Sequence, residues 1–344
     1  MPHRRGDRCA AYDSPTMSEQ PGRPPRLVAN RLTRLRGLLD DEVPVKQVGH
    51  NVLVGTWNVR EFGEVTHAWR AAKDDSPKRD WGSVAMIAEI VSRFDVVALQ
   101  EVQGRIGALR QMLRFLGDSW GLLLTDVNRG SKGGYERMAY VFDTNRVRPS
   151  GLASELGIPE EWHGRRIGTK VLDEFARRPY AVSFVTRGRR RRETFILVTV
   201  HIWYGKKASE RTTEIAGFGN WLADWANEIS DYNQNLIALG DFNIDRADDP
   251  NYEALVSSGL TVPDELQGLR RTIFDEEDDH SHYDQVAWFT GRTTDQVTVP
   301  ALSLAYGGNA GSVDFRKVIR TRDKVDLSYR LSDHYPLWVE LLVR

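Results

Sequence analysis

The stretch "LSDHYPLWVEL", residues 331–341, joins a core strand to an ionisable pair. From Leu337 to Leu341 the apolar residues occupy every second position, which predicts a half-buried β-strand. Asp333 and His334 stand directly before that strand. A side chain that takes part in chemistry must be held rigidly, so we expect the strand to supply the anchorage and the two residues before it to supply the chemistry.

The same pattern recurs along the chain: several other apolar runs also begin or end on a polar residue. Asn58 ends "LVGTWN", Glu101 ends "VVALQE", His201 ends "ILVTVH", Asp241 and Asn243 end "IALGDFN", and Asp284 opens "YDQVAWF". Each residue alone also fits a turn or a helix cap. Together they predict strand ends that converge at one edge of a folded domain.

The order of apolar runs indicates more strands than helices. Strands are expected at 52–59, 95–102, 120–127, 138–143, 180–186, 194–202, 235–243, 283–289 and 334–342, and helices at 81–94, 104–116 and 208–230. Several neighbouring strands are separated by short turns, as in hairpins. This pattern predicts an α+β fold of two packed sheets flanked by helices.

Composition excludes some classes of function and leaves others open. The chain has 344 residues, with 47 basic and 48 acidic side chains, so its net charge does not indicate a nucleic-acid or membrane protein. Cys9 is the single cysteine, which excludes an intrachain disulfide. The sequence has neither a signal peptide nor a long apolar span, so we expect a soluble cytoplasmic protein with no membrane span and no obligate protein partner.

The chemistry of the strand-end residues favours a hard cation. Clustered carboxylates repel one another and are costly to bury without compensation. Glutamate, aspartate and asparagine offer only oxygen ligands, which suit Mg²⁺ or Mn²⁺ bound together with substrate phosphate better than they suit zinc. His201 and His334 are better suited to proton transfer or to phosphate binding.

With these motifs in order, the chain resembles the endonuclease/exonuclease/phosphatase superfamily, and within it the deoxyribonuclease I branch. The motifs are "TWNVREFGE", "VVALQEV", "YERMAYVFD", "FARRPYAVSF", "VTVHIW", "LGDFNID", "YDQVAW" and "SDHYPLWVEL". The resemblance implies a four-layer α/β/β/α sandwich of two mainly antiparallel sheets. It also implies a catalytic domain over residues 51–344. The composition of residues 1–27, rich in Pro, Gly and charge, predicts a disordered tail, and the leucine spacing predicts an amphipathic helix and linker at 28–50.

The resemblance further implies a role for each residue. Metal ligands are expected at Glu101, Asn58 and Asp333; phosphate contacts at Arg60, Arg177 and Asn58; and catalytic groups at His201, Glu136, His334, Asp284, Asp241 and Asn243. His201 is expected to pair with Glu136, and His334 with Asp284. Sequence leaves open which pair supplies the acid and which the base, although we favour His334 at the phosphate and His201 as the donor to the leaving group.

The implied function is metal-dependent hydrolysis of a nucleic-acid backbone, most directly by a DNA endonuclease of low sequence specificity. The alternative is a phosphatase or a sphingomyelinase-type phosphoesterase acting on a small or lipid phosphate, because one fold and catalytic set serve all these substrates. Two departures weaken the DNA reading. Gln103 stands where the vertebrate enzyme inserts an arginine into the minor groove, and Gly134 where it has a stacking tyrosine, although Tyr135 follows at once.

Two charged segments remain ambiguous. The arginine run in "TRGRRRRET", residues 186–194, fits a solvated hairpin tip as well as a phosphate grip. His280 and His282 lie in "DEEDDHSHYD", for which we expect a charged surface loop in preference to a metal site.

Overall fold

The protein is described here from a computed structural model, which covers residues 21–129, 134–158, 160, 166–167, 170–171, 174–188, 192–227, 235–276, 280–291 and 302–343. Most of the predicted N-terminal tail, with Cys9, lies outside the described residues. The same holds for residues 189–191 of the arginine run and for residues 277–279 of the acidic segment.

Two six-stranded sheets form the centre of the molecule. The first has the order β13 (Ala305–Ser312), β14 (Leu337–Leu342), β1 (Asn51–Phe62), β2 (Val96–Gln103), β4 (Glu136–Asp143), β3 (Trp120–Leu124). The second has the order β11 (Leu260–Thr261), β12 (His282–Phe289), β10 (Leu236–Ile244), β9 (Thr194–His201), β8 (Tyr180–Thr186), β5 (Val147–Glu155). Only β1 with β2 and β9 with β10 are parallel among the described pairs.

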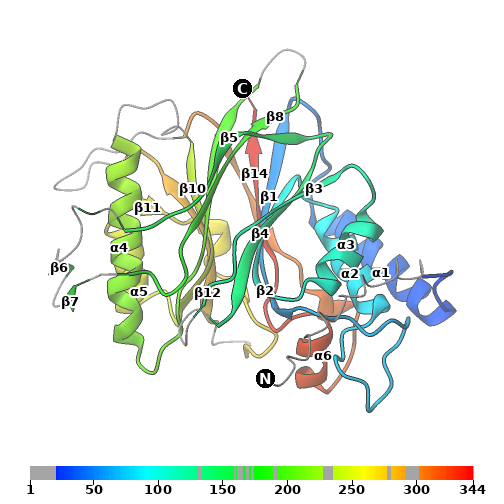
Figure 1. Cartoon of the computed structure of the whole chain (residues 1–344). Helices are drawn as coiled ribbons and strands as arrows, with labels where there is room; N and C mark the ends of the chain where they lie inside the picture. Colours follow the sequence, from blue (N-terminus) through cyan, green and yellow to red (C-terminus); the bar gives the residue numbers. More distant parts are fainter. Residues whose placement is uncertain are drawn as a thin grey trace, which may run out of the picture.

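Helices cover the outer faces of both sheets. They are α1 (Arg26–Glu42), α2 (Trp81–Val91), α3 (Gly107–Leu116), α4 (Ala208–Asn227), α5 (Pro250–Val256) and α6 (Lys324–Arg330), with short 3-10 turns η2 (Asp264–Leu266) and η3 (Phe315–Lys317). A further two-stranded hairpin joins β6 (Arg166–Ile167) to β7 (Lys170–Val171). Figure 1 shows α1, α2 and α3 on one side of the paired sheets and α4 with α5 on the other. The predicted four-layer α/β/β/α sandwich is therefore confirmed.

Strand β1 shows why this sequence builds two cores. Val52 and Val54 belong to the core between the sheets, which continues under α4, whereas Leu53 and Trp57 belong to the core beneath α1, α2 and α3. Successive side chains of a strand point to opposite faces, so one run of apolar residues serves both cores. The buried Leu35 of α1 joins the second of these cores.

Three expectations from sequence differ from the structure. Helix α1 begins at Arg26, two residues before the expected start. The edge strands β5 and β13 were not expected, because Pro149 in the first and Gly307 and Gly308 in the second are poor strand formers. His282 was expected in a surface loop but is buried at the start of β12, where burial lowers its pKa to about 4.

Strand β14 allows a test of whether its apolar residues serve stability while the residues before it, Asp333 and His334, serve catalysis. Leu337 is fully buried in the core between the sheets. We expect Leu337→Ala to lower the free energy of unfolding by about 3 kcal/mol, since the truncation removes buried methyl groups and leaves a cavity. Urea unfolding measures the loss, and turnover per folded molecule should stay unchanged. A large fall in turnover without a loss of stability would contradict this division.

None of the described helices is both long enough and apolar enough to cross a membrane.

Candidate active site

One edge of the sandwich collects the polar residues that the sequence places at strand ends. The first sheet brings Asn58 on β1, Glu101 on β2, Glu136 on β4 and His334 just before β14, and the second sheet brings His201 on β9, Asp241 and Asn243 on β10 and Asp284 on β12. Strand register places Asp241 beside both His201 and Asp284. This edge lies at the end of the sheets away from the C-terminus, as β14 in Figure 1 shows.

A buried polar contact joins the two sheets directly below this edge. The Gln100 amide nitrogen donates to the Thr56 hydroxyl at 3.1 Å and to the Thr199 hydroxyl at 2.9 Å. Gln100 precedes Glu101, while the two threonines lie two positions before Asn58 and His201. Because a buried amide is costly to leave unpaired, this contact fixes how the two halves of the site face each other.

Backbone irregularities turn several site residues out of the regular ladder. Glu101 and Asn243 have positive φ of 58° and 52°, and the strand registers shift on either side of them. Glu61 and Tyr135, at φ 46° and 56°, lie near the same edge. Non-glycine residues in this conformation are strained and cluster at functional sites, and bulges re-aim side chains.

His201 is held between two carboxylates. Its Nδ1 lies 3.0 Å from Glu136 Oε2, and its Nε2 lies 3.6 Å from Asp241 Oδ2. The Arg177 guanidinium contacts Glu136 at 3.1 Å and donates to the His201 carbonyl oxygen at 3.3 Å. Burial alone would raise the pKa of Glu136, but the hydrogen bond from His201 and the charge of Arg177 lower it.

Asp241 occupies the centre of the site. Its Oδ2 accepts from the Asn58 Nδ2 at 2.9 Å, and its Oδ1 accepts from the Asn243 backbone N–H at 2.9 Å. Burial would raise the pKa of Asp241, but the nearby His334 and His201 lower it below its ordinary value. Asp241 is therefore a carboxylate at neutral pH, placed between the two histidines.

His334 forms the second histidine–carboxylate pair. Its Nδ1 lies 2.6 Å from Asp284 Oδ2, and the Trp57 indole donates to its carbonyl oxygen at 2.8 Å. Burial by itself would lower the pKa of His334, but the charges of Asp284 and Asp241 raise it well above its ordinary value. Burial also raises the pKa of Asp284 to about 6, so at neutral pH this pair is an imidazolium bound to a carboxylate.

Four expected site residues have contacts that the sequence did not indicate. Arg60 and Asp333, expected at phosphate and at metal, bind each other through an Nη1–Oδ2 contact of 2.6 Å. Arg177, also expected at phosphate, is buried, and its Nε lies 3.1 Å from Glu136 Oε2 beside the His201 pair. The Asn243 side chain donates to the Ile202 carbonyl oxygen at 2.7 Å.

The donor set at Glu101 suits a cation that relies on few protein ligands. The Glu101 carboxylate accepts from Asn58 Nδ2 at 3.0 Å and from the Glu61 N–H at 2.8 Å. Among the described residues, no group of three or more His, Cys, Asp or Glu side chains is arranged to hold a metal. Mg²⁺ typically takes one or two carboxylates, keeps several waters and binds substrate phosphate, so the oxygen donors present fit that ion.

A groove borders the site, and Arg105, which the motifs do not single out, is among its lining residues. The groove is about 720 Å³ in volume and is lined by Glu101 and Glu136 together with Gln103, Arg105 and Tyr135. The Arg105 side chain is 82% exposed. It lies two positions after Gln103, which replaces the minor-groove arginine of the vertebrate enzyme. The sequence could have indicated Arg105, because it follows four residues after Glu101, the glutamate at the end of β2.

Arg79, a second missed residue, is buried behind the site and has no carboxylate partner among the described residues. Among the described residues its guanidinium donates only to main-chain carbonyl oxygens, near the end of β1 and at Arg330 and Leu331, where α6 ends. Burial lowers the pKa of Arg79 to about 10. The sequence offered no signal for it, because a lone arginine before a helix is ordinarily on the surface.

The edge of this two-sheet sandwich thus carries two histidine–carboxylate pairs around a central aspartate. The sequence matches the Endonuclease/Exonuclease/phosphatase family over residues 55–305, and the protein belongs to that family. This confirms the resemblance seen in the motifs.

Two curated proteins are similar to this chain. A deoxyribonuclease of Thioalkalivibrio sp. (strain K90mix) is 28% identical over 197 residues, which cover 56% of this chain and 46% of that protein. The chain thus spans about half the length of this relative. Bovine (Bos taurus) deoxyribonuclease-1 is 26% identical over 323 residues, which cover 90% of this chain and 99% of that protein.

Among solved structures, an endonuclease/exonuclease/phosphatase family protein from Bacteroides thetaiotaomicron has the same fold. It aligns with a TM-score of 0.52 at 17% identity, covering 86% of this chain and 98% of the other.

Proposed function

We propose that the protein is a metal-dependent phosphodiesterase that hydrolyses a nucleic-acid backbone, most directly a DNA endonuclease of low sequence specificity. The observation that carries this proposal is the placement of Asp241 between two histidine–carboxylate pairs, each with one buried and one half-buried member, beside an open groove. In-line attack of water on a phosphodiester needs a group that activates the water, a proton donor for the leaving oxygen and positive charge near the phosphoryl oxygens, and Asp241, His201 and His334 can supply these three functions.

Each half of the reaction has a group in place. In this proposal Asp241 orients the attacking water and takes its proton as the new P–O bond forms. His201 protonates the leaving oxygen as the other P–O bond breaks, and Glu136 fixes its orientation through Nδ1. Because Asp284 holds Nδ1 of His334, Nε2 is the nitrogen left to contact a phosphoryl oxygen.

Glu101 would be the principal ligand of Mg²⁺ or Mn²⁺, with Asn58 and Asp333 near the ion or its waters. The ion, when bound, supplies charge neutralisation on the phosphoryl oxygens. Arg60 and Asp333 bind each other, so a ligand that engages Asp333 would free Arg60 to contact phosphate.

DNA is the substrate that the relatives favour, because both curated proteins are called deoxyribonucleases. The groove supports an extended substrate, as Tyr135 is 63% exposed beside Glu136 and Arg105 reaches solvent at its rim. Gln103 in place of a minor-groove arginine leaves most of the binding to phosphate contacts, which carry little sequence information. Low sequence specificity follows from that balance.

The direct test is the conversion of supercoiled plasmid to open circles by the purified full chain. We expect nicking in Mg²⁺ and a return to background when a chelator removes the ion, because the carboxylate-rich site cannot neutralise a phosphate by itself. Single-stranded DNA, RNA and a panel of small phosphate esters run in parallel. Release of phosphate or phosphocholine from that panel with plasmid left intact would replace the proposal with the phosphatase or sphingomyelinase-type alternative.

A further inference from the structure

A concentration of arginines lies next to the Asp333–His334 side of the active site. A shallow pocket there is lined by Arg270, Arg316, Lys317, Arg320 and Arg322, with Asp314 as its only carboxylate among the described residues. For a chain with almost equal numbers of acidic and basic residues, this is a marked local excess of positive charge. Such an excess indicates an anionic partner.

The carboxylates near this pocket do not neutralise its arginines. Asp314 accepts from the Arg316 backbone N–H at 3.0 Å as the N-cap of η3, and Glu42 pairs with Lys317. Among the described residues, no carboxylate lies within ion-pair distance of the four arginines at 270, 316, 320 and 322. We call these four residues the basic strip.

Two hydrogen bonds join the basic strip to the active site. The Arg316 guanidinium donates to the Ile273 carbonyl oxygen at 3.1 Å, and the Ile273 N–H donates to the Asp333 carbonyl oxygen at 2.8 Å. The neighbouring Thr272 forms a bridge with His334. A polymer bound at His334 would therefore have the basic strip beside it.

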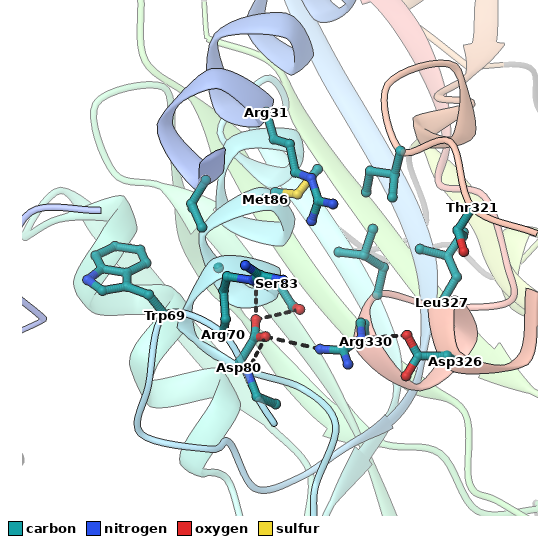
Figure 2. Close-up of a pocket in the computed structure, with 15 residues that line it drawn as sticks. Arg31, Trp69, Arg70, Asp80, Ser83, Met86, Thr321, Asp326, Leu327 and Arg330 are labelled. Atoms are coloured by element: carbon teal, nitrogen blue, oxygen red, sulfur yellow. Dashed lines mark hydrogen bonds and ion pairs between the residues drawn. The ribbon is translucent and has the colours of Figure 1, made fainter. Parts of the chain in front are cut away.

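The positive charge continues away from the active site into a second pocket. Ile319 and Thr321 line both pockets, and the second also contains Arg31 of α1 and Arg70. Figure 2 shows Asp80 joined to Ser83 and Arg330, and Arg330 joined to Asp326, which leaves these carboxylates engaged. Burial and the charge of Arg70 lower the pKa of Arg31, as expected for cations that crowd one another.

We propose that the basic strip binds backbone phosphates of the nucleic acid several nucleotides away from the scissile bond. This inference rests on the proposed function and deepens it, because a small phosphate ester reaches the histidines without touching the strip. Four arginines without a carboxylate partner among the described residues, of which Arg320 and Arg322 are exposed, attract backbone phosphates, and each phosphate contact releases counterions.

The test compares two triple variants of the full chain. The first, Arg270→Ala/Arg320→Ala/Arg322→Ala, removes three cations from the strip. The matched control, Arg148→Ala/Arg187→Ala/Arg192→Ala, removes three exposed arginines at the other end of the sheets. Arg187 lies there because its N–H donates to the Arg146 carbonyl oxygen and Arg146 contacts Asn51, the first residue of β1. Asn51 is about 23 Å from Asn58 at roughly 3.3 Å per residue.

We expect the strip variant to bind a 30-base-pair duplex at least about tenfold more weakly than wild type in metal-free buffer. The slope of log affinity against log salt should fall by about 2 to 3, since each lost phosphate contact removes close to one unit. Cleavage at low DNA concentration should fall with affinity, whereas hydrolysis of bis(p-nitrophenyl) phosphate should stay within about twofold. The control variant should behave like wild type.

The outcomes separate the inference from the proposed function. Wild-type affinity and salt slope in the strip variant would overturn the inference, and so would equal losses in both variants or binding of anionic vesicles in place of duplex. If the wild type binds duplex through the strip but never cleaves it, the proposed function fails and the inference stands. Neither binding nor cleavage by the wild type would overturn both.

Discussion

Replacing His334 with glutamine should lower kcat for phosphodiester cleavage by about 10³-fold while the protein stays folded. Glutamine can donate a hydrogen bond to Asp284 in place of Nδ1, so the buried carboxylate is not left unpaired. It has no second ring nitrogen and no positive charge to place on a phosphoryl oxygen. The loss should appear in kcat as well as in kcat/KM, because the missing interaction strengthens in the transition state.

Steady-state kinetics on plasmid and on a small diester measures this loss, and thermal unfolding shows whether the fold survives. Leu337→Ala, three residues along the same segment, is the matched control, because it should lower stability and leave turnover unchanged. A His334→Gln protein that retains more than a tenth of wild-type turnover would remove His334 from the reacting centre.

Replacing Arg79 with alanine should lower the free energy of unfolding by at least about 4 kcal/mol. The guanidinium donates at 2.8 Å to the carbonyl oxygens of both Arg60 and Glu61, and at 3.1 Å to that of Leu331. Weaker contacts of 3.3 Å reach two further carbonyls, those of Val59 and Arg330. Each buried acceptor left without a donor costs about 1–3 kcal/mol.

Urea unfolding measures the change, and Arg36→Ala is the control. Arg36 pairs with Glu89 at 2.8 Å, but its side chain is 54% exposed, so its removal should cost less than about 1 kcal/mol. Arg79→Lys should recover only part of the loss, because an ammonium has fewer donors and no fork geometry. Equal small losses for Arg79→Ala and Arg36→Ala would show that the carbonyls find water or new partners.

The order of strands was largely predictable because the information is local. Alternating or continuous apolar runs mark the strands, and a polar residue at the end of each run marks the edge at which they meet. Asn58, Glu101, His201 and Asp284 were all identified in this way, and the structure brings them to one edge. The strands β5 and β13 were missed because edge strands tolerate glycine, proline and polar residues, which hide the pattern.

Partners and burial were harder to predict. The contact of Arg60 with Asp333 joins residues 273 positions apart, and its 2.6 Å length depends on how β1 lies beside the segment before β14. His282 was placed in a surface loop because its neighbours in sequence are charged, yet the start of β12 buries it. Arg79 reads as an ordinary surface arginine until the end of β1 and the residues after α6 close around it.

The sequence by itself therefore determined the layered fold and the family. It also determined which polar residues stand at the ends of strands, including the Asp333–His334 pair before the last strand. Tertiary structure alone decided that Asp241 lies between the two histidines, that Arg177 contacts Glu136, and that Arg316 of the basic strip contacts Ile273, which is hydrogen-bonded to Asp333. The physical reason is one of range. Strand patterns arise from neighbouring residues, whereas an ion pair or a charged surface depends on distances of a few ångströms between segments that only packing brings together.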